Sequence, residues 1–221
     1  MAVIGAVREG QLGVMVATLD LCVQMGRAYW APLFCGGLLL STLLQAVAGN
    51  PYLGGLLAVS FPCWAAAGGV FLRALQTGES ILATARQLVS VDSVMLLLLA
   101  GVYQLGMASV SVLVLRAGSG WVLPLGGGGL LLLWWLLLLP WLGANLLMPY
   151  LVLCERHNLP DAWMTSLQRL KPAWPACLAL CALSALAFWL SQQVYLQVVV
   201  LPLLLLWPAA LFQQLGGRLH G

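Results

Sequence analysis

Charged side chains are scarce in this chain. Only 7% of its 221 residues are charged, nine basic and six acidic, whereas 62% are hydrophobic. Water-soluble domains carry about 25% charged residues, so a water-soluble fold cannot cover this much apolar surface. A bilayer can, and a transmembrane helix needs roughly 20 mostly apolar residues, which leaves room for about six. The composition predicts an integral membrane protein.

Ionisable side chains are missing from the interiors of the apolar runs. The chain has two histidines, His157 and His220, and both lie outside these runs. Ion-coupled transporters and proton pumps place ionisable groups within the membrane, and haem held between helices needs histidine ligands. The sequence therefore argues against a pump and a haem protein, but not against a protein that binds lipids or uncharged solutes. We expect no cofactor and no nucleic-acid partner.

Cysteine is present, but its positions do not indicate disulfides. Four of the six cysteines lie inside apolar stretches, where a free thiol behaves as a small hydrophobe. No cleavable signal follows Arg8 and Glu9, so we expect residue 1 to remain in the mature protein.

Uninterrupted apolar runs predict six membrane spans. They lie near residues 31–49, 52–74, 93–115, 129–153, 173–192 and 197–215. Eight basic residues fall before span one, between spans two and three, between spans four and five, and in the tail, against Arg116 alone on the other side. By the positive-inside rule, both termini are cytoplasmic.

A short amphipathic helix precedes each pair of spans. Asp20, Gln24 and Arg27 form one polar stripe before span one, and similar patterns cover residues 79–90 and 159–170. Such helices lie in the membrane interface. The predicted fold is an all-α membrane protein, a single domain over 1–221, with about six transmembrane helices arranged as three hairpins, each preceded by a short cytoplasmic amphipathic helix.

Prolines lie inside each even-numbered span, where they remove a helix hydrogen bond and kink the helix. They are Pro62; Pro140 and Pro149; and Pro202 and Pro208. Asn145 lies between Pro140 and Pro149, where unpaired carbonyls are expected. Two interpretations stay open for these three residues. They support the kinks, which is the simpler one, or they line a solute pathway.

The most polar stretch, residues 153–174, gathers a thiol, two carboxylates and an imidazole within nine residues. A metal site needs about three or four ligands, and here only Cys154 and His157 form a CxxH pair. A Cys–His nucleophile also needs an orienting third group, which nothing identifies. Asn158 and Asp161 instead form a helix-start signal. We expect no catalytic or metal-binding residue here, only a link between two spans.

Four basic residues at the cytoplasmic side are candidates for contact with anionic headgroups or with a protein partner. They are Arg27, Arg86, Arg169 and Lys171. The partners expected are membrane lipids and a membrane or cytoplasmic protein.

Three segments carry a resemblance: "GRAYWAPLF", "AAAGGVFLRALQTGE" and "NLPDAWMTSLQRLKPAW". The chain resembles a group of uncharacterised six-span bacterial inner-membrane proteins, similar in layout to the membrane domain attached to some glycerophosphodiester phosphodiesterases. Ala162, Ser166, Arg169 and Trp174 match the group's short cytoplasmic helix, whereas the Gly-rich loop 116–129 departs from it. The resemblance implies a bacterial inner-membrane location and brings no catalytic residues.

The leading hypothesis is a non-enzymatic polytopic membrane protein, an accessory or scaffold factor in envelope or lipid homeostasis that uses its cytoplasmic helices for contact. The lack of intramembrane charge and the short outer loops motivate it. The alternative is a transporter or permease subunit for a neutral or apolar solute, with a path around Asn145. An intramembrane enzyme using Cys154 and His157 ranks third.

Overall fold

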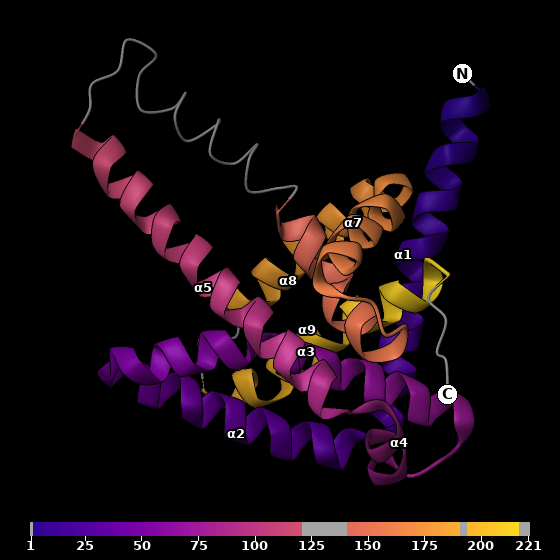
Figure 1. The fold of residues 1–221 in the computed structure, drawn as a ribbon. Coiled ribbons are helices and arrows are strands. Elements are labelled where there is room, and N and C mark those ends of the chain that lie inside the picture. The colour runs from indigo at the N-terminus through magenta and orange to yellow at the C-terminus, as the bar shows by residue number, and fades with distance from the viewer. Residues whose placement is uncertain (1, 121–140, 191–193, 217–221) are drawn as a thin grey trace.

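The computed structural model describes residues 2–120, 141–190 and 194–216, and every regular element in these ranges is a helix (Figure 1). The predicted all-α class is confirmed for this part of the chain. In chain order the helices are α1 (Ala2–Ala28), α2 (Trp30–Gly49), α3 (Pro51–Thr77), α4 (Ile81–Leu88), α5 (Val91–Gly120), the helix Trp141–Cys154, α7 (Leu159–Leu170), the 3₁₀ turn Lys171–Ala173, α8 (Trp174–Leu190) and α9 (Val194–Gln214).

Membrane-spanning length is reached by one or two of the described helices. Tyr52–Thr77, within α3, is long and apolar enough to cross a membrane. A second candidate arises if α4 and the Val91–Met107 part of α5, which meet at 81°, form one bent span. The apolar helices Trp30–Leu43, Trp141–Cys154 and Val200–Gln214 are shorter. Six spans therefore stay a prediction, although each predicted span overlaps one apolar helix.

Local sequence signals set both ends of α3. The Asn50 side chain accepts a hydrogen bond from the Tyr52 N–H at 3.0 Å, and Pro51 occupies the first helical position, where its missing N–H breaks no bond. Gly78 ends the helix with φ 69°, a left-handed conformation that favours glycine. As a result, Asn50 alone separates α2 from α3, and the two helices lie side by side (Figure 1).

The connecting helices α4 and α7 form where the sequence predicts amphipathic segments. Ser80 caps α4 by accepting from the Ala83 N–H, and Asn158 caps α7 by accepting from the Asp161 N–H at 3.0 Å. The predicted helix start at Asn158 is confirmed. The first helix, α1, is longer than the short helix expected before span one, because no proline interrupts residues 2–28.

Two glycines allow close backbone contact between helices. A Cβ on Gly101 of α5 would collide with the Val59 carbonyl of α3, and a Cβ on Gly37 of α2 would collide with the Val198 carbonyl of α9. Small residues at helix contacts let backbones approach in this way. These contacts place α3 against α5 and α2 against α9.

The core gathers around the helix Trp141–Cys154 and the second half of α9. Tyr150 and Phe212, both fully buried, stack with their ring centroids 5.7 Å apart. Met25 brings α1 into the same cluster, and Leu97 brings in α5. The segment 153–174, which emerges from this core, is consequently supported on several sides.

Candidate functional site

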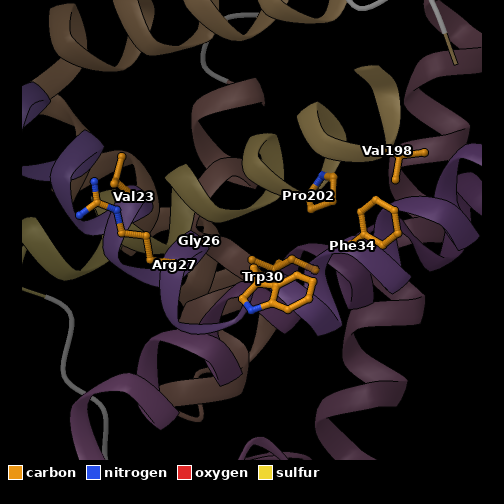
Figure 2. A pocket seen from close by; sticks show the side chains of 8 residues that line it. Val23, Gly26, Arg27, Trp30, Phe34, Val198 and Pro202 are labelled. Carbon is orange, nitrogen blue, oxygen red and sulfur yellow. The ribbon is translucent and has the colours of Figure 1, made fainter. Parts of the chain in front are cut away.

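An apolar groove lies between α1, α2 and α9 (Figure 2). It has a volume of about 610 Å³, and its walls include Trp30 and Phe34 of α2 and Pro202 of α9. Arg27, in the last turn of α1, is the one charged residue that lines it among the described residues. Figure 2 shows Arg27 toward one end of the groove and Phe34 with Val198 toward the other.

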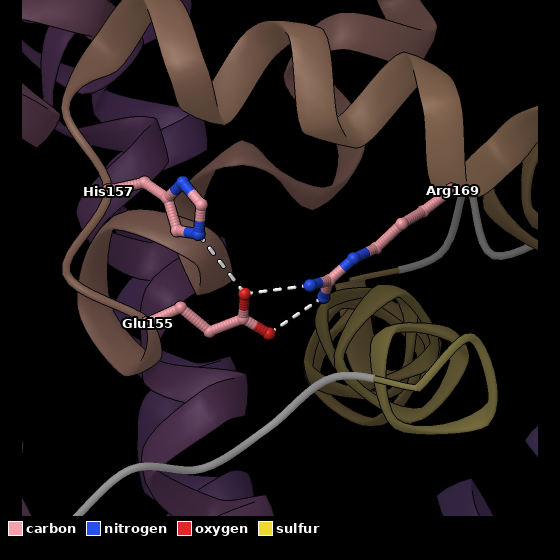
Figure 3. A network of polar contacts seen from close by, with 3 residues as sticks. All are labelled: Glu155, His157 and Arg169. Carbon is pink, nitrogen blue, oxygen red and sulfur yellow. Dashed lines mark hydrogen bonds and ion pairs between the residues drawn. The ribbon is translucent and has the colours of Figure 1, made fainter.

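A buried carboxylate organises the link between the helix Trp141–Cys154 and α7 (Figure 3). The Glu155 side chain is only 7% exposed. Arg169 donates to its two oxygens from both terminal nitrogens, at 2.7 and 2.8 Å, and His157 Nε2 lies 3.2 Å from Oε2. A bidentate, charge-assisted pair is among the stronger polar contacts in proteins. It fixes the C-terminal turn of α7 against the start of the link.

Arg156 joins the same link to the corner between α4 and α5. Its guanidinium donates to Ser90 Oγ at 2.9 Å and to the Gln87 carbonyl at 3.3 Å. The backbone of Arg156 has φ 59°, an uncommon conformation for a residue with a side chain. The turn at Arg156 thus directs one basic side chain toward α4, while the neighbouring carboxylate faces α7.

The four predicted contact residues fall into two groups. Arg169 is occupied by Glu155 and also lies over the Phe212 ring of α9, with its guanidinium carbon 5.7 Å from the centroid. Its side chain is 23% exposed. Arg27, Arg86 and Lys171 are exposed, and within the described ranges no carboxylate forms an ion pair with them. Of the four predicted contact residues, these three are available to a ligand.

Asn145 connects three helices. Its Oδ1 accepts from Gln104 Nε2 of α5 at 3.0 Å and from Trp163 Nε1 of α7 at 3.1 Å, while its Nδ2 donates to the Trp141 carbonyl at 2.8 Å. This carbonyl is not the one that Pro149 frees, because a proline unpairs the carbonyl four residues before it, here that of Asn145 itself. The side chain therefore joins helices and does not repair that kink.

The prolines predicted inside the even spans lie within helices wherever the structure describes them. Pro62 lies in α3, Pro202 and Pro208 lie in α9, and Pro149 is buried in the helix Trp141–Cys154. Pro140 lies outside the described residues. The proposed pathway role of Asn145, Pro140 and Pro149 stays a prediction.

The motif residues of α7 pack it against the preceding helix. Ser166 Oγ donates to the Gly143 carbonyl at 2.6 Å and accepts from the Leu147 N–H at 3.3 Å. Ala162 is fully buried. A Cβ on Gly143 would come within 2.8 Å of the Trp174 ring, so the indole lies directly on that glycine. In this chain the motif forms a helix-packing surface.

Cys154 and His157 do not face one another as a nucleophile and base. The Cys154 thiol is buried against α3, where a Cβ on Gly69 would lie 3.2 Å from Sγ. Burial raises the pKa of this thiol to about 12, although Arg73 and Arg156 partly oppose the shift. The His157 ring contacts Glu155 instead. In the three described ranges, no three His, Cys, Asp or Glu side chains gather as a metal site.

Comparisons with known proteins identify no relative. No protein-family model, no curated protein and no solved structure matches the chain. The resemblance drawn from the sequence therefore stays a prediction, and function must be argued from the residues themselves.

Proposed function

We propose that the protein is a six-span protein of the bacterial inner membrane, with both termini cytoplasmic, and that it is a non-enzymatic accessory or scaffold factor in envelope or lipid homeostasis. The six apolar helices α2, α3, α5, Trp141–Cys154, α8 and α9 support the layout, since each overlaps a predicted span. The low charge of the chain supports a place in a membrane, and the resemblance drawn from the sequence is the ground for the bacterial inner membrane.

The observation that carries the proposal is the anchoring of α7. Its inner face is held by Ser166 and Arg169, while Asp161, Met164 and Gln168 form an exposed stripe on the outer face. Met164 is 59% exposed. A flexible thioether on a rigid helix is well suited to bind a protein partner. The polar groups on the inner face of α7 thus fix the helix in place, and its outer face remains available to bind a partner.

A second surface of the same kind lies on α4. Leu82 and Arg86 are exposed one turn apart on α4, and Val89 is exposed directly after its last residue. Arg156 fixes the end of this helix through a hydrogen bond to the Gln87 carbonyl. Residues with this spacing share one face of a helix. α4 and α7 together give the proposed contact surface two exposed stripes, each of which combines apolar and charged side chains.

The alternative, a permease for a neutral solute, is favoured by one cavity. It has a volume of about 380 Å³ and lies between α3, α5 and Trp141, with Gln104 among its lining residues. The Gln104 side chain donates a hydrogen bond to Asn145 Oδ1. A solute path here would require this hydrogen bond to open during transport.

Site-specific photo-crosslinking in bacterial membranes tests the accessory role. A photoreactive residue replaces Met164 in one variant and Leu82 in another, and buried Ala162 serves as the control position. We expect a discrete protein adduct from both exposed positions and none from the control, with its identity read by mass spectrometry. If neither exposed position gives an adduct and deletion of the gene leaves lipid composition and envelope integrity unchanged, the proposal is wrong.

A further inference from the structure

We propose that the groove between α1, α2 and α9 is a binding site for one anionic phospholipid. The phosphate would bind Arg27, and an acyl chain would lie over Trp30, Phe34 and Pro202. This inference names a ligand for the lipid role and rests on the membrane location proposed above. It does not depend on a protein partner at α4 or α7.

The charge of Arg27 is uncompensated within the described part of the chain. Arg27 is exposed, and none of the ion pairs there involves it. The acidic residue two turns earlier on α1, Asp20, accepts instead from Gln24 Nε2 at 2.8 Å. A guanidinium binds phosphate oxygens through paired N–H donors. The groove therefore offers a cationic end that is complementary to an anionic headgroup.

The rest of the groove is suited to hydrocarbon. Trp30 is 70% exposed and Phe34 is 47% exposed, so two aromatic faces on α2 are left uncovered by the protein. The volume of about 610 Å³ lies within the usual range for ligand sites, roughly 300–1,000 Å³. A smaller cavity of about 150 Å³, lined by α2, α3 and α9, shares Leu33 and Pro202 with the groove. An acyl chain that passes Pro202 would have further apolar space beyond it.

The shape of the groove has a simple cause in the sequence. Gly37 lets the α9 backbone approach α2 at Val198, which sets one wall. Gly26 contributes no side chain between Val23 and Arg27, which leaves the α1 side open. Helix packing therefore forms the groove without filling it.

Along α2, the order of the groove's lining residues matches the depth of a lipid. Arg27 and Trp30 precede predicted span one, at the level where basic and tryptophan side chains meet headgroups. Phe34 lies about one turn further along α2, within that span. A phosphate at Arg27 and a chain along α2 would thus occupy the depths that they have in the surrounding bilayer.

Native mass spectrometry of the full chain, purified in mild detergent, tests the site. Phosphatidylglycerol and phosphatidylcholine with identical acyl chains are added separately, and the fraction of lipid-bound monomer is measured. We expect one preferentially retained phosphatidylglycerol. Arg27→Gln should lower that preference about fivefold, the contribution of roughly one basic side chain at a membrane surface. Val23→Trp, which fills the groove, should reduce retention of both lipids.

Two matched variants control for charge and bulk. Arg116→Gln removes a basic residue from α5, just as Arg27→Gln does from α1, and Val16→Trp adds an indole on α1 outside the groove. Both should retain phosphatidylglycerol as the wild type does. Equal retention of the two lipids by wild type, an unchanged preference in Arg27→Gln, or a dimer that replaces the lipid-bound monomer would overturn the inference. None of these results would alter the crosslinking outcome at Met164, so the two proposals fail separately.

Discussion

Arg169 donates hydrogen bonds to both oxygens of Glu155, 14 residues earlier in the sequence, at 2.7 and 2.8 Å, and so joins the two ends of the loop and helix between them. Arg169 also lies over the Phe212 ring, which connects this pair to α9. The polar residues that suggest a catalytic cluster in the sequence therefore position α7. We call the Glu155–Arg169 ion pair the clasp.

The first prediction concerns this clasp. Glu155→Gln leaves the Arg169 guanidinium without its carboxylate, and Arg169→Met takes two charge-assisted hydrogen bonds from the buried Glu155 carboxylate. Each change should lower the free energy of unfolding by about 3 kcal/mol. The double variant should lose less than the sum of the two losses, because no charge is then stranded. Thermal unfolding in detergent measures the three values. Additive losses would show that the two side chains do not interact.

The second prediction uses two glycines of α5. Gly101→Ala places a methyl group against the Val59 carbonyl and should lower the free energy of unfolding by about 2 kcal/mol through overpacking. Gly106→Ala meets nothing within 4 Å and should be neutral or stabilising by up to about 1 kcal/mol, since alanine favours a helix. Equal melting temperatures for the two variants would contradict the contact between α3 and α5.

The third prediction concerns Cys154. A raised pKa keeps the thiol protonated, and only the thiolate is alkylated. With the other five cysteines replaced, alkylation at pH 8 should be on the order of a thousandfold slower in the folded protein than after unfolding, for a pKa of about 12 in place of 9.0. The rate should rise about tenfold for each pH unit toward that pKa. Rapid labelling of the folded protein at pH 8 would revive a reactive role for this cysteine.

The fourth prediction separates a structural from a transport role for Asn145. Asn145→Leu removes two hydrogen bonds between helices and one within its own helix. Because bonds between membrane helices average about 0.6 kcal/mol, loss of the two should lower the free energy of unfolding by about 1 kcal/mol. Gln104→Leu removes one of these two and should cost about half as much. Liposome flux of neutral solutes should be the same for wild type and both variants. Flux through wild type that Asn145→Leu abolishes would favour the permease.

Much of the fold follows from local sequence signals. The caps at Asn50 and Asn158 and the amphipathic pattern of α7 each act within a few residues, so their effect is visible along the chain. The bond between Gln104 and Asn145 spans 41 positions and depends on how α5 crosses the next helix. No periodicity encodes such a crossing. The groove at Arg27 could likewise not be predicted from the sequence, because α9, which is distant along the chain, supplies one of its walls.

Residue types alone were also ambiguous at the link. Arg169 is one of four basic residues with the same expected role, yet it alone among them has a carboxylate partner in the described part of the chain. The partner, Glu155, precedes α7 in the sequence, whereas Arg169 lies in the last turn of this helix. Which basic side chain remains available for a ligand is therefore set by tertiary packing.

The measurement that tests the account most directly is the membrane topology. In a variant without native cysteines, Glu79→Cys labels the link between α3 and α4, and Ser119→Cys labels the end of α5. In intact cells, a maleimide that does not cross the inner membrane should react at position 119 and not at position 79, and permeabilisation should expose both. Labelling at position 79 in intact cells, or at neither position after permeabilisation, would contradict a cytoplasmic contact surface on α4 and α7.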